Sequence, residues 1–312
     1  MAVLLCSGQG AQKVGMGADL LSVPEVAEAF EQASDVLGVD VAALSREGSA
    51  DDINAAFNAQ ALTVALSLGI GRTLQARGLA VSAIVGQSLG QITGLALSGS
   101  LSDKDMLALL DVRAHALEES CAAQAGGMMA LLGVDEQTAQ ALCDECAHGD
   151  ILVLANYNCP GQIVASGMID AIDRLQEVAR EKRIRCARLN TAGAFHSPLM
   201  QQASQKVKAF CETLTFADPE ILLICNTDAR AFVASEAAQR LGSQVVSPVL
   251  FNQSIQSLIE QGETCFIEAG FGGVLFGLVK RINKNVTRYK VGTREELEAL
   301  CEALSLPADC AV

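Results

Sequence analysis

The chain has 312 residues, of which 50% are hydrophobic and 19% are charged. This composition can bury a large core and excludes a disordered or fibrous chain. The formal net charge of −14 argues against general nucleic-acid binding, which depends on a basic surface. No apolar run approaches the roughly 18 residues of a membrane-spanning helix, and the first residues lack the basic start and long apolar core of a signal peptide. We therefore expect a cytoplasmic protein with neither a membrane nor a nucleic-acid partner.

The eleven cysteines follow no disulfide spacing. Several lie in apolar runs, where a thiol packs as a small hydrophobic side chain. One Cys-x-x-Cys pair is present, Cys143 and Cys146, but the sequence offers no second pair to complete a zinc site. We expect reduced thiols and no metal.

Short apolar runs alternate with longer amphipathic segments, a pattern typical of α/β proteins. Glycine-rich turns follow the first two apolar runs, as in a sheet whose strands are joined by helices. The expected strands of the main body are residues 2–6, 81–85, 221–226 and 264–268, and its expected helices are residues 55–77, 89–97, 104–123 and 247–261.

The middle of the chain has an order of its own. The expected elements are a strand at 128–133, a helix at 136–146, strands at 151–155 and 162–166, a helix at 169–182 and a strand at 184–189. This βαββαβ order matches the ferredoxin-like split motif. We therefore expect a small domain, residues 125–190, inserted into a larger α/β body with a parallel sheet, residues 1–124 and 191–312.

The sequence Gly86-Gln87-Ser88-Leu89-Gly90 lies between a predicted strand and a predicted helix. It fits the G-x-S-x-G nucleophile elbow, in which small residues let the chain turn sharply and expose the serine Oγ. The backbone N–H of Leu89, at the start of the helix, is placed to stabilise an oxyanion. The pattern predicts that Ser88 is a nucleophile.

Such a serine needs a base, and the chain has three histidines. His148 is expected in a surface turn, and His115 lies on a helix two residues from Arg113, so the two point to different faces. His196 lies in a loop of small residues before a proline. These surroundings favour His196, although a purely structural histidine fits the residues as well.

Arg113 lies beside an apolar helix segment, where an arginine is costly to bury without a carboxylate partner. Its planar guanidinium suits a substrate carboxylate. A surface arginine paired with Glu118 or Asp111 is equally compatible with the residues.

Motifs along the whole chain resemble those of the malonyl-CoA:acyl carrier protein transacylases of bacterial fatty acid synthesis. In family order they are GQGAQ at 8–12, QAL at 60–62, GQSLG at 86–90, VR at 112–113, GGMMALLG at 126–133, NYNCPGQIVASG at 156–167, AFHSPLM at 194–200, SPVLF at 247–251 and EAGFGGVLFGLVKRI at 268–282. The resemblance implies an α/β-hydrolase-like body with an inserted ferredoxin-like domain. It also implies an acyl-carrier-protein S-malonyltransferase that needs no cofactor.

The resemblance assigns roles to individual residues. Ser88 matches the nucleophile and His196 matches its base. Arg113 matches the arginine that holds the malonyl carboxylate. Gln9 and Leu89 match the residues whose backbone N–H groups form the oxyanion hole.

Other matched positions shape the pocket. Gln244 matches the residue whose backbone carbonyl orients the histidine, and Asn158 matches a pocket-lining asparagine. Phe195 is typical of malonyl-accepting relatives. Two departures are Gln87, where the family usually has histidine, and Gln91, where it usually has glutamate; they leave the rate and the acyl preference open, while every reacting group is kept.

The implied reaction is a ping-pong cycle. Ser88 takes the malonyl group from malonyl-CoA as an ester, and the phosphopantetheine thiol of acyl carrier protein then accepts it for fatty acid synthesis. Because both proteins are expected to be acidic, docking needs a local basic surface. Reversing charge at Arg183 and Lys284 is expected to raise the KM for carrier protein and to spare malonyl-CoA. The docking candidates are Arg180, Lys182, Arg183, Lys280, Arg281 and Lys284.

Several alternatives remain open at this point. A serine esterase or thioesterase would share the elbow but would gain nothing from a buried Arg113. A discrete acyltransferase of a polyketide synthase, or the malonyl-transfer subunit of a malonate decarboxylase, would use the same residues. A catalytically silent scaffold is disfavoured because Ser88, His196 and Arg113 are all present. No apolar stripe demands a partner subunit, so a monomer is compatible with the sequence.

Overall fold

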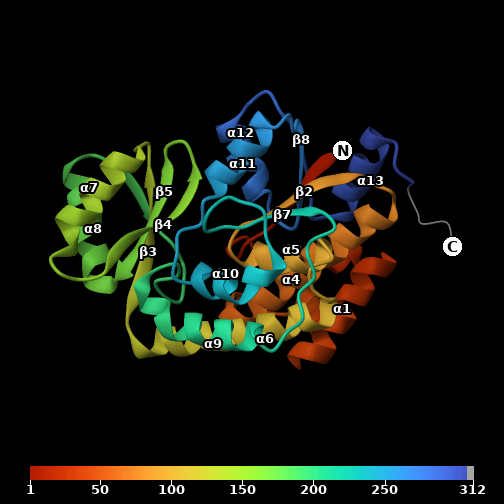
Figure 1. The fold of residues 1–312 in the computed structure, drawn as a ribbon, viewed down its shortest axis with the longest axis horizontal. Helices are drawn as coiled ribbons and strands as arrows, with labels where there is room; N and C mark the ends of the chain where they lie inside the picture. The colour runs from red at the N-terminus through yellow and green to blue at the C-terminus, as the bar shows by residue number, and fades with distance from the viewer. Residues whose placement is uncertain (308–312) are drawn as a thin grey trace.

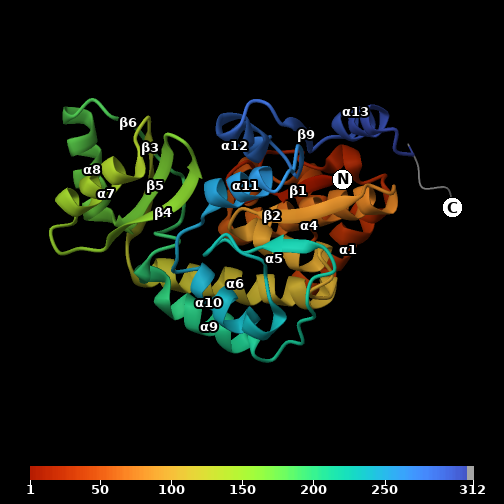
Figure 2. The same ribbon diagram turned by 45° about the horizontal axis from the view of Figure 1, so that its top comes forward.

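The computed structural model describes residues 1–307. The chain forms two lobes side by side, a larger body and a smaller lobe built from the middle of the chain (Figure 1 and Figure 2). The body contains a parallel sheet with the strand order β7-β2-β1-β8-β9. Its strands are β1 (Ala2–Cys6), β2 (Val81–Gly86), β7 (Leu222–Ile224), β8 (Cys265–Ala269) and β9 (Thr287–Val291).

Both faces of this sheet are covered by helices, which is why β1 is apolar and buried at every position. Leu4 and Ile84 face one helical layer, whereas Leu5 and Val85 face the other, because neighbouring side chains of a strand point to opposite faces. No helix within residues 1–307 is long and apolar enough to cross a membrane. The body helices are α1 (Pro24–Leu37), α2 (Val41–Glu47), α3 (Ala50–Asn54), α4 (Ala56–Ala76), α5 (Leu89–Leu97), α6 (Asp103–Ala123), α9 (Gln201–Cys211), α10 (Ala237–Gln244), α11 (Phe251–Glu260), α12 (Val274–Ile282) and α13 (Arg294–Leu304).

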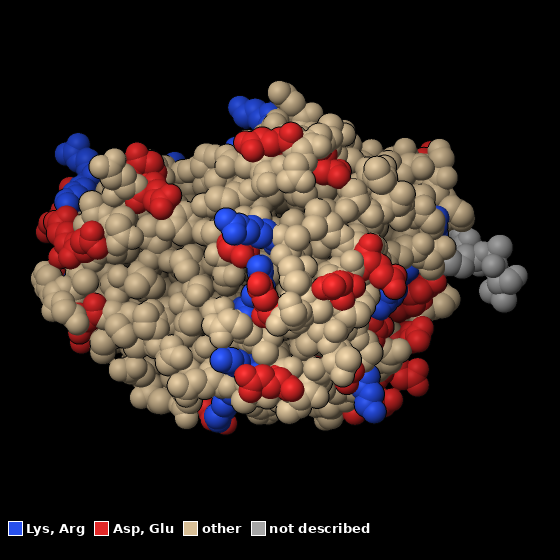
Figure 3. Space-filling view, in the orientation of Figure 1, with Lys and Arg blue, Asp and Glu red and all other residues tan. Residues whose placement is uncertain are grey.

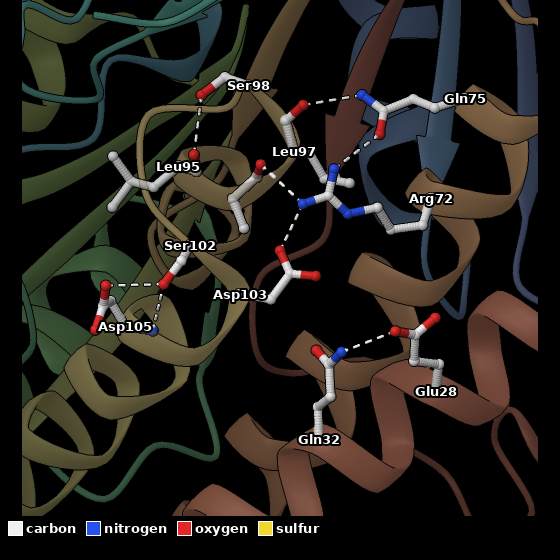
Figure 4. A network of polar contacts seen from close by, with 11 residues as sticks. Glu28, Gln32, Arg72, Gln75, Leu95, Leu97, Ser98, Ser102, Asp103 and Asp105 are labelled. Atoms are coloured by element: carbon white, nitrogen blue, oxygen red, sulfur yellow. Dashed lines mark hydrogen bonds and ion pairs between the residues drawn. The ribbon is translucent and has the colours of Figure 1, made fainter. Parts of the chain in front are cut away.

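A polar network fastens α4 to α5 and α6 (Figure 4). Arg72 of α4 donates to the Ala96 carbonyl at 3.2 Å and pairs with Asp103 at 2.5 Å. Gln75, one turn along α4, donates to the Leu97 carbonyl at 2.9 Å. The network fixes the relative positions of α5, which follows Ser88, and α6, which carries Arg113.

Two expected body elements are shorter in the structure. The helix expected at 247–261 begins only at Phe251, because Val249 pairs with the small lobe: its N–H donates to the Ala155 carbonyl at 2.9 Å and its carbonyl accepts the Tyr157 N–H at 2.9 Å. The strand expected at 221–226 ends at Ile224, because the Cys225 N–H instead donates to the Arg230 carbonyl at 2.8 Å and begins a turn.

The small lobe contains an antiparallel sheet with the order β4-β5-β3-β6. With its two helices this is the ferredoxin-like βαββαβ arrangement, so the expected fold class is confirmed. The small-lobe elements are β3 (Gly126–Leu132), α7 (Glu136–Ala147), β4 (Leu152–Cys159), β5 (Gln162–Met168), α8 (Ile169–Glu181) and β6 (Arg185–Arg188).

The two faces of the small sheet differ in what they contact. One face, with Met129 and Leu131, packs against α7 and α8. The other, with Met128, Ala130 and Val164, is turned towards the body. We propose domain boundaries near residues 124/125 and 190/191, just after α6 ends and just after β6 ends.

Candidate active site

Ser88 occupies a strained turn between β2 and α5. Its backbone angles are φ 51° and ψ −104°, a conformation that costs a non-glycine residue about 1–3 kcal/mol. The flanking glycines are required by space: a Cβ on Gly90 would lie 2.0 Å from the Cys6 carbonyl oxygen, and one on Gly86 would lie 2.0 Å from the Gly90 carbonyl carbon. The strand–turn–helix context expected from G-x-S-x-G is present.

His196 lies against the serine. Its Nε2 is 2.7 Å from Ser88 Oγ, and its Nδ1 is 2.9 Å from the Gln244 carbonyl oxygen and 3.2 Å from that of Ser247. Because two carbonyls can only accept, they favour the proton on Nδ1 and leave Nε2 free to accept from Ser88. Burial first, and the charge of Arg113 second, lower the pKa of His196 to about 4. The imidazole is therefore neutral at neutral pH, as a general base must be.

Arg113 is 4% exposed and reaches the same point from α6. It donates from Nη1 to Gln60 Oε1 at 3.0 Å and from Nη2 to Ser88 Oγ at 3.3 Å. Its buried Nε has no hydrogen-bond partner, and it forms no ion pair within residues 1–307. Burial lowers the pKa of Arg113 to about 10, so the guanidinium remains charged at neutral pH. The surface ion pair with Glu118 or Asp111 that the sequence also allowed is absent from the described chain, because Arg113 is buried; Asp111 Oδ1 lies 3.4 Å from His115 Nδ1 instead.

A pocket of about 260 Å³ between the two lobes holds these groups. Gln9 and Leu89 line it, and Leu89 is the first residue of α5, so its N–H has no acceptor within the helix. Gln87 of the elbow donates to Asn158 Oδ1 of β4 at 2.8 Å, which joins the lobes across the pocket. Phe195, directly before the histidine, forms part of the wall.

The other two histidines lie outside this constellation. His148 ends α7 with φ 49° and is exposed, and His115 is exposed on α6. No group of three or more His, Cys, Asp or Glu side chains that could hold a metal ion occurs in the part of the chain that the structure describes.

Two residues at the site were not singled out from the sequence for a role. Asn226, just after β7, accepts the Ser88 N–H at 2.8 Å, and Gln60 accepts from Arg113. The available signal for Asn226 was its place beyond a strand next to β2, because the carboxyl ends of parallel strands meet at one edge of the sheet. The sequence feature that could have indicated Gln60 is its position, as a polar residue, at the start of a long apolar helix.

The chain belongs to the Acyl transferase domain family, whose model matches residues 3–295. It is 34% identical to the malonyl CoA-acyl carrier protein transacylase of Bacillus subtilis, over 96% of both chains.

Solved structures show the same similarity. The crystal structure of malonyl-CoA:acyl carrier protein transacylase from Xanthomonas oryzae is 32% identical with a TM-score of 0.93, covering 97% of this chain and 98% of that one. A malonyl-transacylase in complex with its type II PKS acyl-carrier protein is 30% identical with a TM-score of 0.92, covering 96% and 99%.

Proposed function

We propose that the chain transfers the malonyl group from malonyl-CoA to the phosphopantetheine thiol of acyl carrier protein, and so supplies fatty acid synthesis. The observation that carries the proposal is Arg113, a buried cation without a carboxylate partner in the described chain, 3.3 Å from Ser88 Oγ. The distal carboxylate of a malonyl group would pair with it, whereas a neutral acyl group would leave it buried and unpaired. Relatives similar over nearly the whole chain carry the transacylase name.

In the first half of the cycle, Ser88 becomes acylated. Its hydroxyl proton passes to His196 Nε2 while Oγ attacks the thioester carbonyl of malonyl-CoA. The N–H groups of Gln9 and Leu89 stabilise the oxyanion. When the tetrahedral intermediate collapses, the C–S bond breaks, coenzyme A takes the proton from His196, and the malonyl ester on Ser88 remains.

In the second half, the thiol of the carrier protein's phosphopantetheine gives its proton to His196 and attacks the ester carbonyl. The C–O bond to Ser88 breaks, and Oγ recovers the proton from the imidazole. The cycle consumes no cofactor beyond its two substrates. Because water would hydrolyse the ester, the pocket between the lobes must favour entry of the thiol.

The carrier protein would dock beside α12. Val274 and Leu278 of this helix line the pocket, and Arg281 of the same helix donates to Gln162 Oε1 at 2.6 Å at the pocket wall. Lys280 is exposed nearby. Acidic and basic side chains lie interspersed over the described part of the face seen in Figure 3, so attraction to an acidic partner must come from a local cluster.

The second basic cluster lies elsewhere. Arg180 lies in the last turn of α8, and Lys182 and Arg183 directly follow this helix. The helix packs on the face of the small sheet opposite to the pocket. Lys182 is also engaged with Glu145. We therefore narrow the docking proposal to Lys280, Arg281 and Lys284.

A carrier protein of polyketide synthesis is the second candidate acceptor. It is favoured by the similar transacylase solved with its type II PKS acyl-carrier protein. Transfer rates to a fatty-acid and a polyketide carrier protein, each loaded with phosphopantetheine, would separate the two. The cytoplasmic location and the monomeric state remain predictions.

The first half of the cycle, acylation of Ser88, is tested by intact-mass spectrometry after mixing the protein with malonyl-CoA or acetyl-CoA. Ser88→Ala is the control. We expect a malonyl adduct on the wild type alone and little acetyl adduct. An acetyl adduct of equal yield would favour an esterase or a general acyltransferase. No adduct with either donor would favour the silent scaffold.

A further inference from the structure

Asn226 is an amide side chain buried to 1% exposure directly beneath the elbow. All four of its polar groups are used. Its backbone N–H donates to Gln91 Oε1 at 2.8 Å, and its backbone carbonyl accepts the Leu250 N–H at 2.8 Å. Its side chain accepts the Ser88 N–H at 2.8 Å and donates to the Gly86 carbonyl at 2.6 Å. A buried amide whose oxygen and nitrogen are both hydrogen-bonded is held in one orientation.

We propose that Asn226 is a positioning residue that holds Ser88 in its reactive conformation. Its one amide group bridges the Gly86 carbonyl at the end of β2 and the N–H of Ser88 in the turn. A strained backbone persists only where its surroundings enforce it, and rotation of the Gln87–Ser88 peptide group, whose N–H Asn226 holds, is the motion that would relax φ of Ser88. The same rotation would carry Oγ away from His196 Nε2. The inference rests on the proposed role of Ser88 as nucleophile.

Gln244 extends this support from the nucleophile to the base. Its side-chain Nε2 donates to the Ser88 carbonyl at 3.0 Å and lies 3.3 Å from Asn226 Oδ1, while its backbone carbonyl faces His196 Nδ1. Gln91 Oε1 accepts from both Asn226 and Gln244. The serine and the histidine are therefore held by one buried set of neutral amides.

Two variants test the proposal through the rate at which the malonyl adduct forms at saturating malonyl-CoA. Asn226→Ala removes both side-chain bonds. Asn226→Asp keeps the size and the acceptor for Ser88 N–H but replaces the donor to Gly86 with an oxygen. We expect acylation about 10²-fold slower in Asn226→Ala, the size of effect that a displacement of about 1 Å produces, and an intermediate loss in Asn226→Asp. The aspartate variant supplies the measurement if the alanine variant does not fold.

Substrate binding separates positioning from general damage. Malonyl-CoA should bind Ser88→Ala with and without Asn226→Ala equally well, within about threefold, because Asn226 does not line the pocket. Leu223→Ala is the matched control: Leu223 is fully buried in β7, the strand that ends two residues before Asn226, so its loss should lower Tm while acylation stays near the wild-type rate.

The outcomes are distinct. If the wild type forms no adduct, the proposed function fails. If the wild type forms the adduct and either Asn226 variant forms it at the same rate, the positioning role is overturned and the function stands. The role is also overturned if Leu223→Ala slows acylation as much as Asn226→Ala does.

Discussion

The two lobes contribute to the pocket in different ways. In the body, Gln9, Ser88 and Asn226 each follow a parallel strand by two or three residues, so three distant segments meet at one edge of the sheet. The small lobe presents the face of an antiparallel sheet, which offers mainly apolar side chains such as Met128 and Val164. In the proposed mechanism, the body therefore supplies the reacting groups and the small lobe shapes the wall of the pocket. Changes in the body should therefore act on kcat, and changes in the small lobe on KM and acyl preference.

The largest effect is expected for His196→Ala. Removing the base should slow malonyl adduct formation by about 10⁴-fold or more, because Ser88 Oγ then has no acceptor for its proton. Single-turnover mass spectrometry measures the rate. His115→Ala, on an exposed helix face, is the control and should acylate normally. Comparable acylation by both variants would remove His196 from the mechanism.

Arg113→Ala should slow acylation by malonyl-CoA about 10²–10³-fold, the cost of leaving a buried charge without its partner. Acetyl-CoA, which has no distal carboxylate, should react no more slowly than with the wild type. Arg113→Lys keeps the charge without the planar guanidinium, so its rate of acylation by malonyl-CoA should lie between those of the wild type and Arg113→Ala. An equal loss with both donors would show that Arg113 acts on Ser88 or on folding rather than on the carboxylate.

Reversing charge beside α12 should act on the second substrate alone. In the Lys280→Glu, Lys284→Glu double variant we expect the KM for carrier protein to rise about tenfold at low salt and less at high salt, because exposed charges are screened. The KM for malonyl-CoA should not change. Arg183→Glu, behind the small sheet, is the matched control. If Arg183→Glu alone raises the KM for carrier protein, the docking surface lies beside the C-terminal end of α8.

A smaller effect is expected for the small-lobe wall. Met128→Ala enlarges the pocket without touching Ser88, His196 or Arg113, so kcat with malonyl-CoA should stay within about threefold. The variant should react faster than the wild type with a donor that carries a substituent on C2, because one methyl group in a pocket is worth about 1–3 kcal/mol. Competition between malonyl-CoA and methylmalonyl-CoA measures this change in acyl preference. A loss of kcat greater than tenfold would contradict the division of roles between the lobes.

The smallest effect concerns pH. The pKa of His196 is lowered by burial and, second, by Arg113. Removing the cation in Arg113→Ala should raise that pKa above about 4, although burial, the larger cause, still holds it below its usual value. The base then becomes protonated at a higher pH, so the acid limb of the acetyl-CoA reaction should move upward. An unmoved acid limb would mean that burial alone sets the pKa of His196.

The same burial makes the folded protein sensitive to acid. His196 has a lower pKa folded than unfolded, so the unfolded chain binds more protons below pH 6.5. This contribution to stability is complete above pH 6.5 and is lost as the pH falls towards 4.

Local pattern was enough for much of the fold. Apolar runs, glycine turns and the βαββαβ order predict the small-lobe sheet and four of the five strands of the body sheet, and G-x-S-x-G predicts the elbow. The fifth strand, β9, was not expected. The two expected elements that are shorter in the structure differ from the prediction because of contacts that local sequence does not show. Val249 lies in an extended segment because it pairs with β4, almost 100 positions away in the chain. Asn226 leaves the strand pattern because Cys225 turns back to Arg230.

The site residues also differ in whether local sequence or long-range packing determines their place. Ser88 is visible from its neighbours, but the choice of His196 and the burial of Arg113 depend on how α6, the 191–197 loop and β2 meet. No spacing in the sequence predicts that these three segments lie together. From the sequence, only the resemblance to a family placed Ser88, His196 and Arg113 in one site.

The pairing of Val249 with β4 has a consequence for recombination between relatives. The segment that carries it, 247–250, also provides the Ser247 carbonyl near His196 Nδ1. A chimera that exchanges residues 125–190 alone would inherit a foreign strand against a native segment, and the mismatch would fall on the histidine. Crossover points that transfer residues 247–250 together with the small lobe should keep the Ser247 carbonyl in its position beside His196.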